Sequence, residues 1–139
     1  MSDCIFCKIV SGEIQSVKVY EDADLEAFLD INPVRPGHTL LVPKVHSDRF
    51  DRMEPAQAGK LFEIVRKLAP AVAAAFGVDS FNASVNSGLA AGQVVFHTHV
   101  HIIPRGSAEE LSHWPRGAYQ GSEAEAVGQK IRAALRGAI

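Results

Sequence analysis

Histidine occurs at every second position at the start of the sequence HTHVHII, and this pattern limits the fold more than any other part of the chain. Side chains of a β-strand point alternately to its two faces, and residues two apart lie about 7 Å from each other on one face. His97, His99 and His101 would therefore share one face of a strand, while the residues between them face the core. We predict this strand over Val94 to Ile103, ended by Pro104.

Other apolar runs predict the remaining elements. Short runs bounded by turn-forming residues predict four further strands, at residues 17–20, 25–29, 38–42 and 81–85, the first two as a hairpin. Helical segments are predicted at residues 4–10, at residues 55–76 and from about Ser122 onward. The sequence thus predicts an α+β fold, an antiparallel sheet of about five strands with two main helices.

Both main helices are expected to be amphipathic. The long one should bury a stripe made of Ala58, Leu61, Ile64, Val65, Leu68, Ala71, Val72 and Ala75. Pro70 lies inside this helix and should bend it or break it in two. The apolar side of the last helix is expected to comprise Ala126, Ile131, Ala134 and Leu135.

Composition restricts the class of protein. We expect a single domain over residues 1–139, with its motifs within residues 4–105 and a C-terminal tail and helix over residues 106–139, irregular around Trp114 and Pro115. A net charge of −2 without a Lys/Arg run argues against a nucleic-acid partner. The N-terminus does not resemble a signal peptide, and no run of about 18 apolar residues occurs, so we expect no membrane contact and a cytoplasmic location.

Three imidazoles in a row can act as metal ligands, nucleophile, proton carriers or phosphate donors. One alternative is a trio of ordinary surface histidines. A second is a catalytic zinc held by all three rings, but a flat strand spaces alternate side chains too widely for them to reach one ion easily.

The sequence resembles the histidine-triad (HIT) proteins, whose signature is His-φ-His-φ-His-φ-φ with φ apolar. HTHVHII matches it, and CIFCKIVSGEI, AFLDINPVRPGHTLLVPKVH and NSGLAAGQ resemble further family blocks in the family order. The resemblance covers about Cys4 to Arg105. Thr98 departs from the signature, where an apolar residue is usual, but it faces away from the expected site.

The resemblance implies that His99 attacks the α-phosphorus of a nucleotide and forms a transient phosphohistidine, which water then hydrolyses. A neutral imidazole is abundant at pH 7 and is a good nitrogen nucleophile. His101 resembles the family histidine beside the phosphate oxygens, and His38 another histidine close to the nucleophile. The alternative for His38 is a histidine that merely caps the start of a strand.

The resemblance also implies a nucleotide pocket. Asn86, Gly92 and Gln93 belong to the loop that wraps the phosphate, and Asp30 matches the carboxylate that binds the ribose hydroxyls. The walls of the base pocket are expected to comprise Ile5, Phe6, Ile9, Phe28 and Ile31. Asp30 is otherwise an ordinary turn residue, and the apolar residues are otherwise core. Some family branches have a serine where this chain has Val94, so the preferred leaving group is left open.

A second cluster contains Cys4 and Cys7, the only cysteines. A Cys-x-x-Cys pair alone can be redox-active, metal-binding or incidental. A family branch with this pair places zinc between it, a histidine in a PKxH segment and the first triad histidine. Here these positions are His46 and His97. Because two Cys and two His close a zinc tetrahedron, the resemblance implies a structural Zn²⁺.

Taken together, these features predict a nucleotide hydrolase or transferase. The resemblance implies a homodimer acting on a purine nucleotide with an AMP or GMP moiety, as a nucleoside phosphoramidate, a dinucleoside polyphosphate or a related adenylate. Two other hypotheses remain open: a non-catalytic nucleotide-binding adaptor, and a hydrolase in which zinc is the catalyst.

Overall fold

The computed structural model describes residues 3–107, 111 and 116–138, and the tail predicted around Trp114 and Pro115 lies outside these residues. Three helices are formed, α1 (Ile5–Val10), α2 (Pro55–Ala75) and α3 (Glu123–Leu135). The strands are β1 (Lys18–Glu21), β2 (Leu25–Leu29), β3 (Thr39–Pro43), β4 (Ser80–Val85) and β5 (Val100–Arg105). Single 3₁₀ turns occur at Phe50–Arg52 and Leu89–Ala91.

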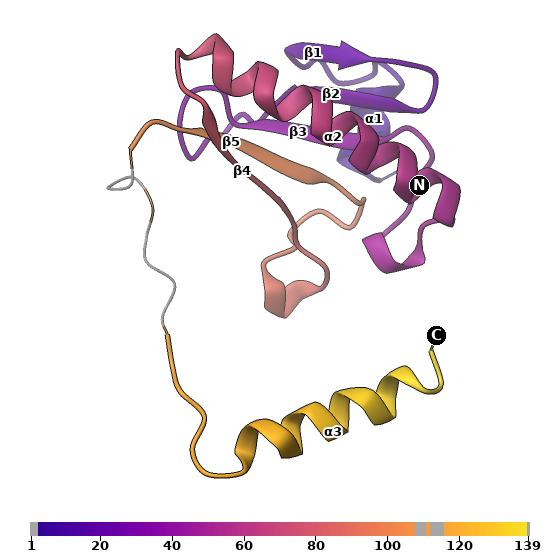
Figure 1. Ribbon diagram of the computed structural model, residues 1–139. Helices are drawn as coiled ribbons and strands as arrows, with labels where there is room; N and C mark the ends of the chain where they lie inside the picture. The colour runs from indigo at the N-terminus through magenta and orange to yellow at the C-terminus, as the bar shows by residue number, and fades with distance from the viewer. Residues whose placement is uncertain (1–2, 108–110, 112–115, 139) are drawn as a thin grey trace.

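The five strands form one antiparallel sheet in the order β1-β2-β3-β5-β4, as predicted (Figure 1). The hairpin between β1 and β2 is closed by Asp22, whose Oδ1 accepts hydrogen bonds from the main-chain N–H groups of Asp24 and Leu25, both at 2.8 Å. Aspartate favours such turns because its side chain satisfies main-chain donors locally. This leaves β3 and β5 in the middle of the sheet, where the histidines lie.

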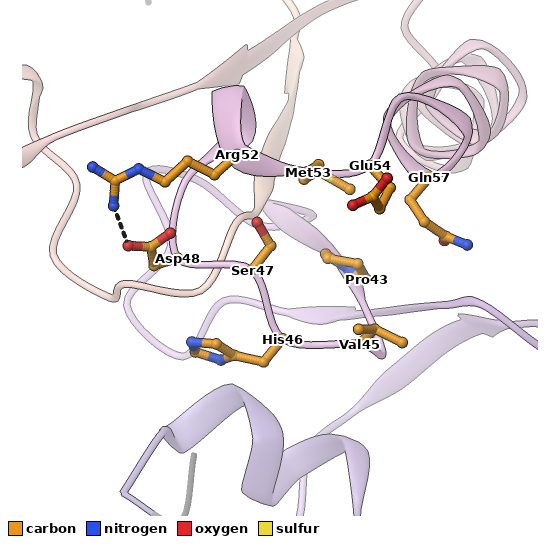
Figure 2. Close-up of a pocket in the computed structure, with 9 residues that line it drawn as sticks. All are labelled: Pro43, Val45, His46, Ser47, Asp48, Arg52, Met53, Glu54 and Gln57. Atoms are coloured by element: carbon orange, nitrogen blue, oxygen red, sulfur yellow. Dashed lines mark hydrogen bonds and ion pairs between the residues drawn. The ribbon is translucent and has the colours of Figure 1, made fainter.

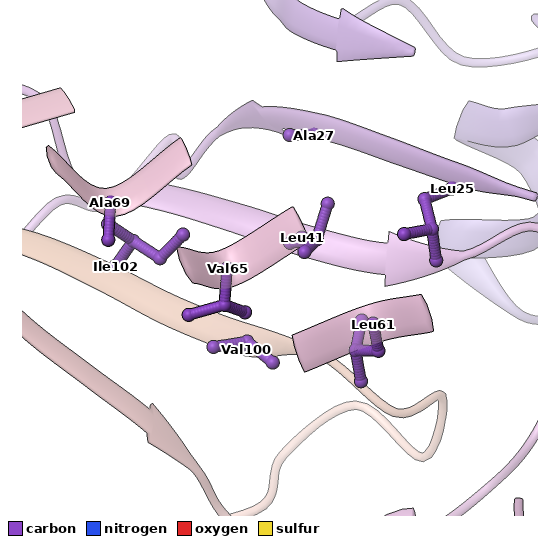
Figure 3. Close-up of a cluster of buried hydrophobic side chains, with 8 residues drawn as sticks. All are labelled: Leu25, Ala27, Leu41, Leu61, Val65, Ala69, Val100 and Ile102. Carbon is purple, nitrogen blue, oxygen red and sulfur yellow. The ribbon is translucent and has the colours of Figure 1, made fainter. Parts of the chain in front are cut away.

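Helix α2 packs across one face of the sheet (Figure 1). Its side chains and those of β2, β3 and β5 form the main core, made of Leu25, Ala27, Leu41, Leu61, Val65, Ala69, Val100 and Ile102 (Figure 3). The predicted stripe is wrong at Ala71 and Ala75, which are exposed, because the buried row instead runs at intervals of four residues through Ala69 and Ala73. The helix is not broken at Pro70 but continues to Ala75.

Helix α1 covers the opposite face of the sheet. Phe6 packs edge-on against Phe28, with ring centroids 5.4 Å apart, in a second cluster with Leu40 and Val42. Glu26 shares this face and is fully buried, yet neither of its carboxylate oxygens has a hydrogen-bond partner among the described residues. Burial raises the pKa of Glu26, because a charged carboxylate is poorly solvated inside a protein.

The histidine strand is shorter at its start than predicted. β5 begins at Val100 rather than Val94, so His97 and His99 precede it and His101 lies within it. The ladder to β3 ends where Leu41 pairs with Val100. Two positions further in this register, Thr98 would be opposite Pro43, which has no N–H. The N–H of Thr98 instead donates to the carbonyl of Ser47 at 2.7 Å.

The strand also continues past Pro104 to Arg105, contrary to the prediction. Pro104 is tolerated because the ladder from β5 to β3 ends at Ile102, so only β4 pairs with the strand at this point.

Two surfaces are exposed in the described part of the chain. β4 forms one edge of the sheet, and Ser80 to Ser84 are exposed, with Phe81 among them. Helix α3 lies beyond this edge, apart from the sheet (Figure 1), and none of its residues is buried. Among the described residues, no helix has the length and hydropathy needed to cross a bilayer.

Candidate active site and metal cluster

The ring of His99 is held in one tautomer. Its Nδ1 lies 2.7 Å from the main-chain oxygen of His97, a distance that requires Nδ1 to carry the proton and donate it. The Nε2 atom therefore has a free lone pair. The ring is 7% exposed and packs edge-on against Phe6 at 5.1 Å. Burial lowers the pKa of His99, although the bond to the His97 carbonyl opposes this. His99 thus presents a neutral nucleophilic nitrogen.

His38 and His101 are joined ring to ring. The main-chain N–H of Val34 donates to Nδ1 of His38 at 3.0 Å, so the proton of a neutral His38 is on Nε2. That Nε2 lies 2.9 Å from Nδ1 of His101 and donates to it. The chain of bonds puts the remaining proton of His101 on its Nε2, where it is available to a ligand. Burial, together with the neighbouring His99 and His38, lowers the pKa of His101 to about 4, so this ring is neutral.

Asp30 lies next to this pair, with Oδ2 3.6 Å from Nε2 of His38. Its other oxygen accepts the main-chain N–H of Asn32 at 2.8 Å. The ligand atoms of Asp30, His38 and His101 lie within 4.8 Å of one another, a spacing compatible with a metal ion. However, His38 already uses Nδ1 as an acceptor, and coordination through Nε2 would require an imidazolate. The geometry favours proton positioning over metal binding here.

The loop between β4 and β5 leads directly into the histidine segment. Gly92 has φ +93°, a left-handed conformation that glycine adopts without strain, and the amide of Asn86 lies beside it. Gln93 is 1% exposed, and its amide bonds to main-chain groups of Gly88, Asp48 and Val95. The side chain of Gln93 therefore stabilises the conformation of this loop from its interior.

The predicted walls of the base pocket divide into two groups. Phe6 and Phe28 are buried and Ile9 packs with them, close to His99. Ile5 and Ile31 lie at the surface, 43% and 87% exposed. The buried group packs against the ring of His99 through Phe6. Ile5 and Ile31 are exposed and accessible to a ligand.

The four residues predicted as metal ligands come together. The ligand atoms of Cys4, Cys7, His46 and His97 all lie within 4.8 Å of one another. Nδ1 of His97 is 3.3 Å from Sγ of Cys4 and 3.2 Å from Nδ1 of His46. Ligands at the corners of a zinc tetrahedron are about 3.3–3.8 Å apart, which follows from bonds of about 2.0–2.3 Å. These residues could hold a metal ion.

The protonation states suit a cation. Nε2 of His97 lies 2.7 Å from the oxygen of Pro43 and donates to it, which leaves Nδ1 with its lone pair toward the thiols. Burial and the neighbouring Cys4 raise the pKa of the Cys7 thiol, an effect that a bound cation would reverse.

A cavity of about 550 Å³ lies beside this cluster, between the segment after β3 and the start of α2 (Figure 2). His46 lines it, together with Ser47, Met53 and Gln57. An ion pair between Arg52 and Asp48 lies at one end (Figure 2). The cavity is separate from the triad histidines, which do not line it.

The comparison with known proteins agrees with this architecture. The family model described as "HIT domain" matches residues 11–108, more than half of the chain. The chain belongs to the HIT family. It is 46% identical over 104 residues to adenylylsulfatase HINT3 of Arabidopsis thaliana, covering 75% of this chain but 53% of that protein. It is 36% identical to adenosine 5′-monophosphoramidase hnt1 of Schizosaccharomyces pombe, covering 96% and 98% of the two chains.

The structure of a zinc-bound relative is similar over nearly the whole chain. A zinc-bound histidine-triad family protein from Mycobacterium smegmatis superposes with a TM-score of 0.76 at 34% identity, covering 97% of this chain and 94% of that chain. The predicted HIT fold is therefore confirmed.

Sequence reasoning missed the main-chain partners that set the histidine tautomers of this HIT chain. The N–H of Val34 and the oxygens of Pro43 and His97 carry no side-chain signal, because every residue has such groups. Sequence reasoning also missed Arg49, whose guanidinium lies beside Gly88 in the loop between β4 and β5. Only a close approach to Gly88 in space identifies it.

Proposed function

We propose that this HIT protein is a nucleotide hydrolase that acts at the α-phosphorus of a purine nucleotide through a phosphohistidine. The observation that carries the proposal is the fixed tautomer of His99, because a lone pair on Nε2 is what an in-line attack on phosphorus requires. The names of the HINT3 and hnt1 relatives support a nucleotide substrate and hydrolysis.

In the first step, Nε2 of His99 forms a bond to the α-phosphorus while the bond to the leaving group breaks, and the leaving group takes the electron pair. His101 donates its Nε2–H to a phosphoryl oxygen and stabilises the charge that develops there. His38 positions His101 by holding its proton on that nitrogen. In the second step, a water molecule attacks phosphorus and the P–N bond breaks, which releases the nucleoside monophosphate and restores neutral His99.

The remaining predicted residues hold the nucleotide. Asp30 would accept the ribose hydroxyls, since Oδ2 faces the histidines and a carboxylate can accept from two vicinal hydroxyls. Asn86 and the main chain at Gly92 would contact the phosphate, and the base would lie over Phe6 and Phe28 between the exposed Ile5 and Ile31.

Cys4, Cys7, His46 and His97 would hold a structural Zn²⁺. The donor set supports this assignment, since two thiolates and two imidazoles fill all four positions and leave none for water. When bound, the ion would tie the start of α1 to the histidine segment.

We also propose that two copies pair through the edge strand β4. Phe81 of this edge and Leu111 line the same pocket. Helix α3 lies beyond the edge (Figure 1), and its Ile131 and Leu135 are exposed. A second copy at β4 would cover the unpaired edge and these apolar side chains. Sedimentation should give a dimer, and Phe81→Glu should give a monomer that retains its thermal unfolding transition.

The stereochemical course tests the reaction itself. Two in-line displacements at one phosphorus give net retention, whereas a single attack by water gives inversion. A substrate with a chiral thio-substituted α-phosphorus, hydrolysed in ¹⁸O-labelled water, distinguishes them. Retention is expected; inversion would eliminate the phosphohistidine and favour direct attack by water, including zinc-bound water.

A further inference from the structure

Arg49 places a cation against the phosphate loop. Its Nη1 lies 3.4 Å from the position that a Cβ on residue 88 would occupy, so the guanidinium is a close neighbour of Gly88. Gly88 adopts φ +97°, a conformation that glycine adopts without strain. The sequence shows no reason for a basic residue at this point.

The segment that carries Arg49 is anchored to both sides of the site. The oxygen of Ser47 accepts the N–H of Thr98, which lies between His97 and His99. The oxygen of Asp48 accepts the amide of Gln93 at 2.6 Å, and Gln93 in turn accepts the N–H of Gly88. Arg49 therefore has a fixed position relative to both the nucleophile and the loop.

The side chain of Arg49 is also oriented. Its Nε and Nη2 donate to the two oxygens of Asp51 at 2.9 and 3.4 Å. The Arg49 guanidinium lowers the pKa of Asp51, so this carboxylate is charged and holds the planar group in place. Among the described residues, no hydrogen bond engages Nη1, the guanidinium nitrogen that lies beside Gly88. Arg49 is about one-third exposed and accessible to a ligand.

A cation in the loop that would hold the phosphate distinguishes between two kinds of leaving group. An amine must take a proton as it leaves phosphorus, whereas sulfate or phosphate leaves as an anion without one. A guanidinium suits the second kind, because its N–H groups match tetrahedral oxyanions. Val94, which follows Gln93 and is 83% exposed, offers no proton to an amine.

We propose that Arg49 is a specificity-determining residue that binds an anionic leaving group, so that the preferred substrates are phosphoric anhydrides of a nucleoside monophosphate. This inference rests on the proposed function. The bond from Nε2 of His99 to phosphorus forms, the P–O bond of the anhydride breaks, and its electron pair stays on the departing oxyanion beside Nη1 of Arg49.

The test compares AMP donors that share the α-phosphorus and differ in the leaving group: adenosine 5′-phosphosulfate, ADP and adenosine 5′-phosphoramidate. We expect Arg49→Gln to lower kcat/KM for the phosphosulfate about ten- to a hundredfold, the effect of losing a charge-assisted hydrogen bond, and to change the phosphoramidate less than about twofold. Arg49→Lys should recover part of the loss. A parallel loss with ADP would identify oxyanion recognition in general, and its absence would restrict the site to sulfate.

Arg66→Gln on α2 is the matched control, since Arg66 is also paired with a carboxylate, that of Glu63. It removes the same charge and should change neither rate, and thermal unfolding checks that both variants fold. Equal losses of Arg49→Gln on the phosphosulfate and the phosphoramidate, or no loss on either, would overturn the inference while the proposed function stands. If the parent protein released AMP from none of the donors, the proposed function would fail, and the inference with it.

Discussion

The main-chain oxygen of His97 accepts the Nδ1 proton of His99 at 2.7 Å, while the ring of His97 faces Cys4, Cys7 and His46. One residue therefore belongs both to the candidate metal cluster and to the orientation of the nucleophile. Its ring is fixed a second time by the oxygen of Pro43. Anything that moves this ring will also move the acceptor that sets the tautomer of His99.

Removal of the metal site should therefore affect both stability and catalysis. We expect protein purified without chelator to contain about one zinc per chain. Cys4→Ala with Cys7→Ala should lose the metal, lower the melting temperature by about 10 °C and reduce kcat. Elemental analysis and calorimetry measure this, with His99→Ala as a control that should keep its zinc. Stoichiometric zinc in the double cysteine variant would show that the thiols are not ligands.

Replacement of the nucleophile should stop turnover and spare binding. His99→Asn or His99→Ala should lower kcat about a thousandfold or more, because no other group in the site can form the bond to phosphorus. Binding of the nucleoside monophosphate, measured by calorimetry, should persist. Comparable rates for parent and variant would contradict the assignment.

The hydrogen bond between His38 and His101 can be tested by comparing two substitutions of His38. His38→Ala frees His101 to place its proton on either nitrogen, so kcat should fall about ten- to a hundredfold while KM changes little. His38→Gln can still donate a proton to Nδ1 of His101 and should retain more activity. If the two variants were equally slow, His38 would contribute to packing and not to the tautomer.

Glu26 should make stability depend on pH. Burial raises the folded-state pKa of Glu26 above the ordinary value of 4.5. As the pH rises, Glu26 therefore loses its proton at a lower pH in the unfolded state than in the folded state. The free energy of unfolding should thus fall as pH rises from 4.5 through the folded-state pKa. Glu26→Gln removes the charge and should be more stable than the parent by about 1–3 kcal/mol above that pKa.

The measurement is urea unfolding of both proteins between pH 4.5 and pH 8.5. The advantage of the variant should grow with pH across this interval. Glu63→Gln is a suitable comparison, because the exposed Glu63 has its pKa lowered by its hydrogen bond to Arg66 and is not among the groups that act on Glu26. A constant difference between Glu26→Gln and the parent would show that Glu26 does not titrate there.

Much of the fold was predictable because local patterns and tertiary packing agree. The hairpin at Asp22 and the span of α2 follow from turn chemistry and helical spacing. The start of β5 was not predictable in this way, because it depends on where Pro43 of another strand meets Thr98. Likewise, the residues of β2 give no indication that Glu26 is buried, since its burial arises only when β2 is paired between β1 and β3 in the folded chain.

For the candidate site, the residue types were predictable and their protonation was not. The motif names His99, His101, His38 and the four metal-ligand candidates. Which nitrogen of each ring carries a proton depends on main-chain groups such as the N–H of Val34 and the oxygen of Pro43. These groups are brought to the rings by the fold and leave no trace in the sequence.

The segment from Asn86 to His99 connects two strands but is not part of the sheet. Hydrogen bonds of the buried Gln93 amide stabilise it, where strand pairing stabilises the sheet. The scaffold and the reactive loop are therefore stabilised by different contacts. Exposed positions such as Val94 can be exchanged without loosening the core beneath α2. Homologous proteins can therefore change substrate preference by substitutions in this loop while the sheet and α2 stay the same.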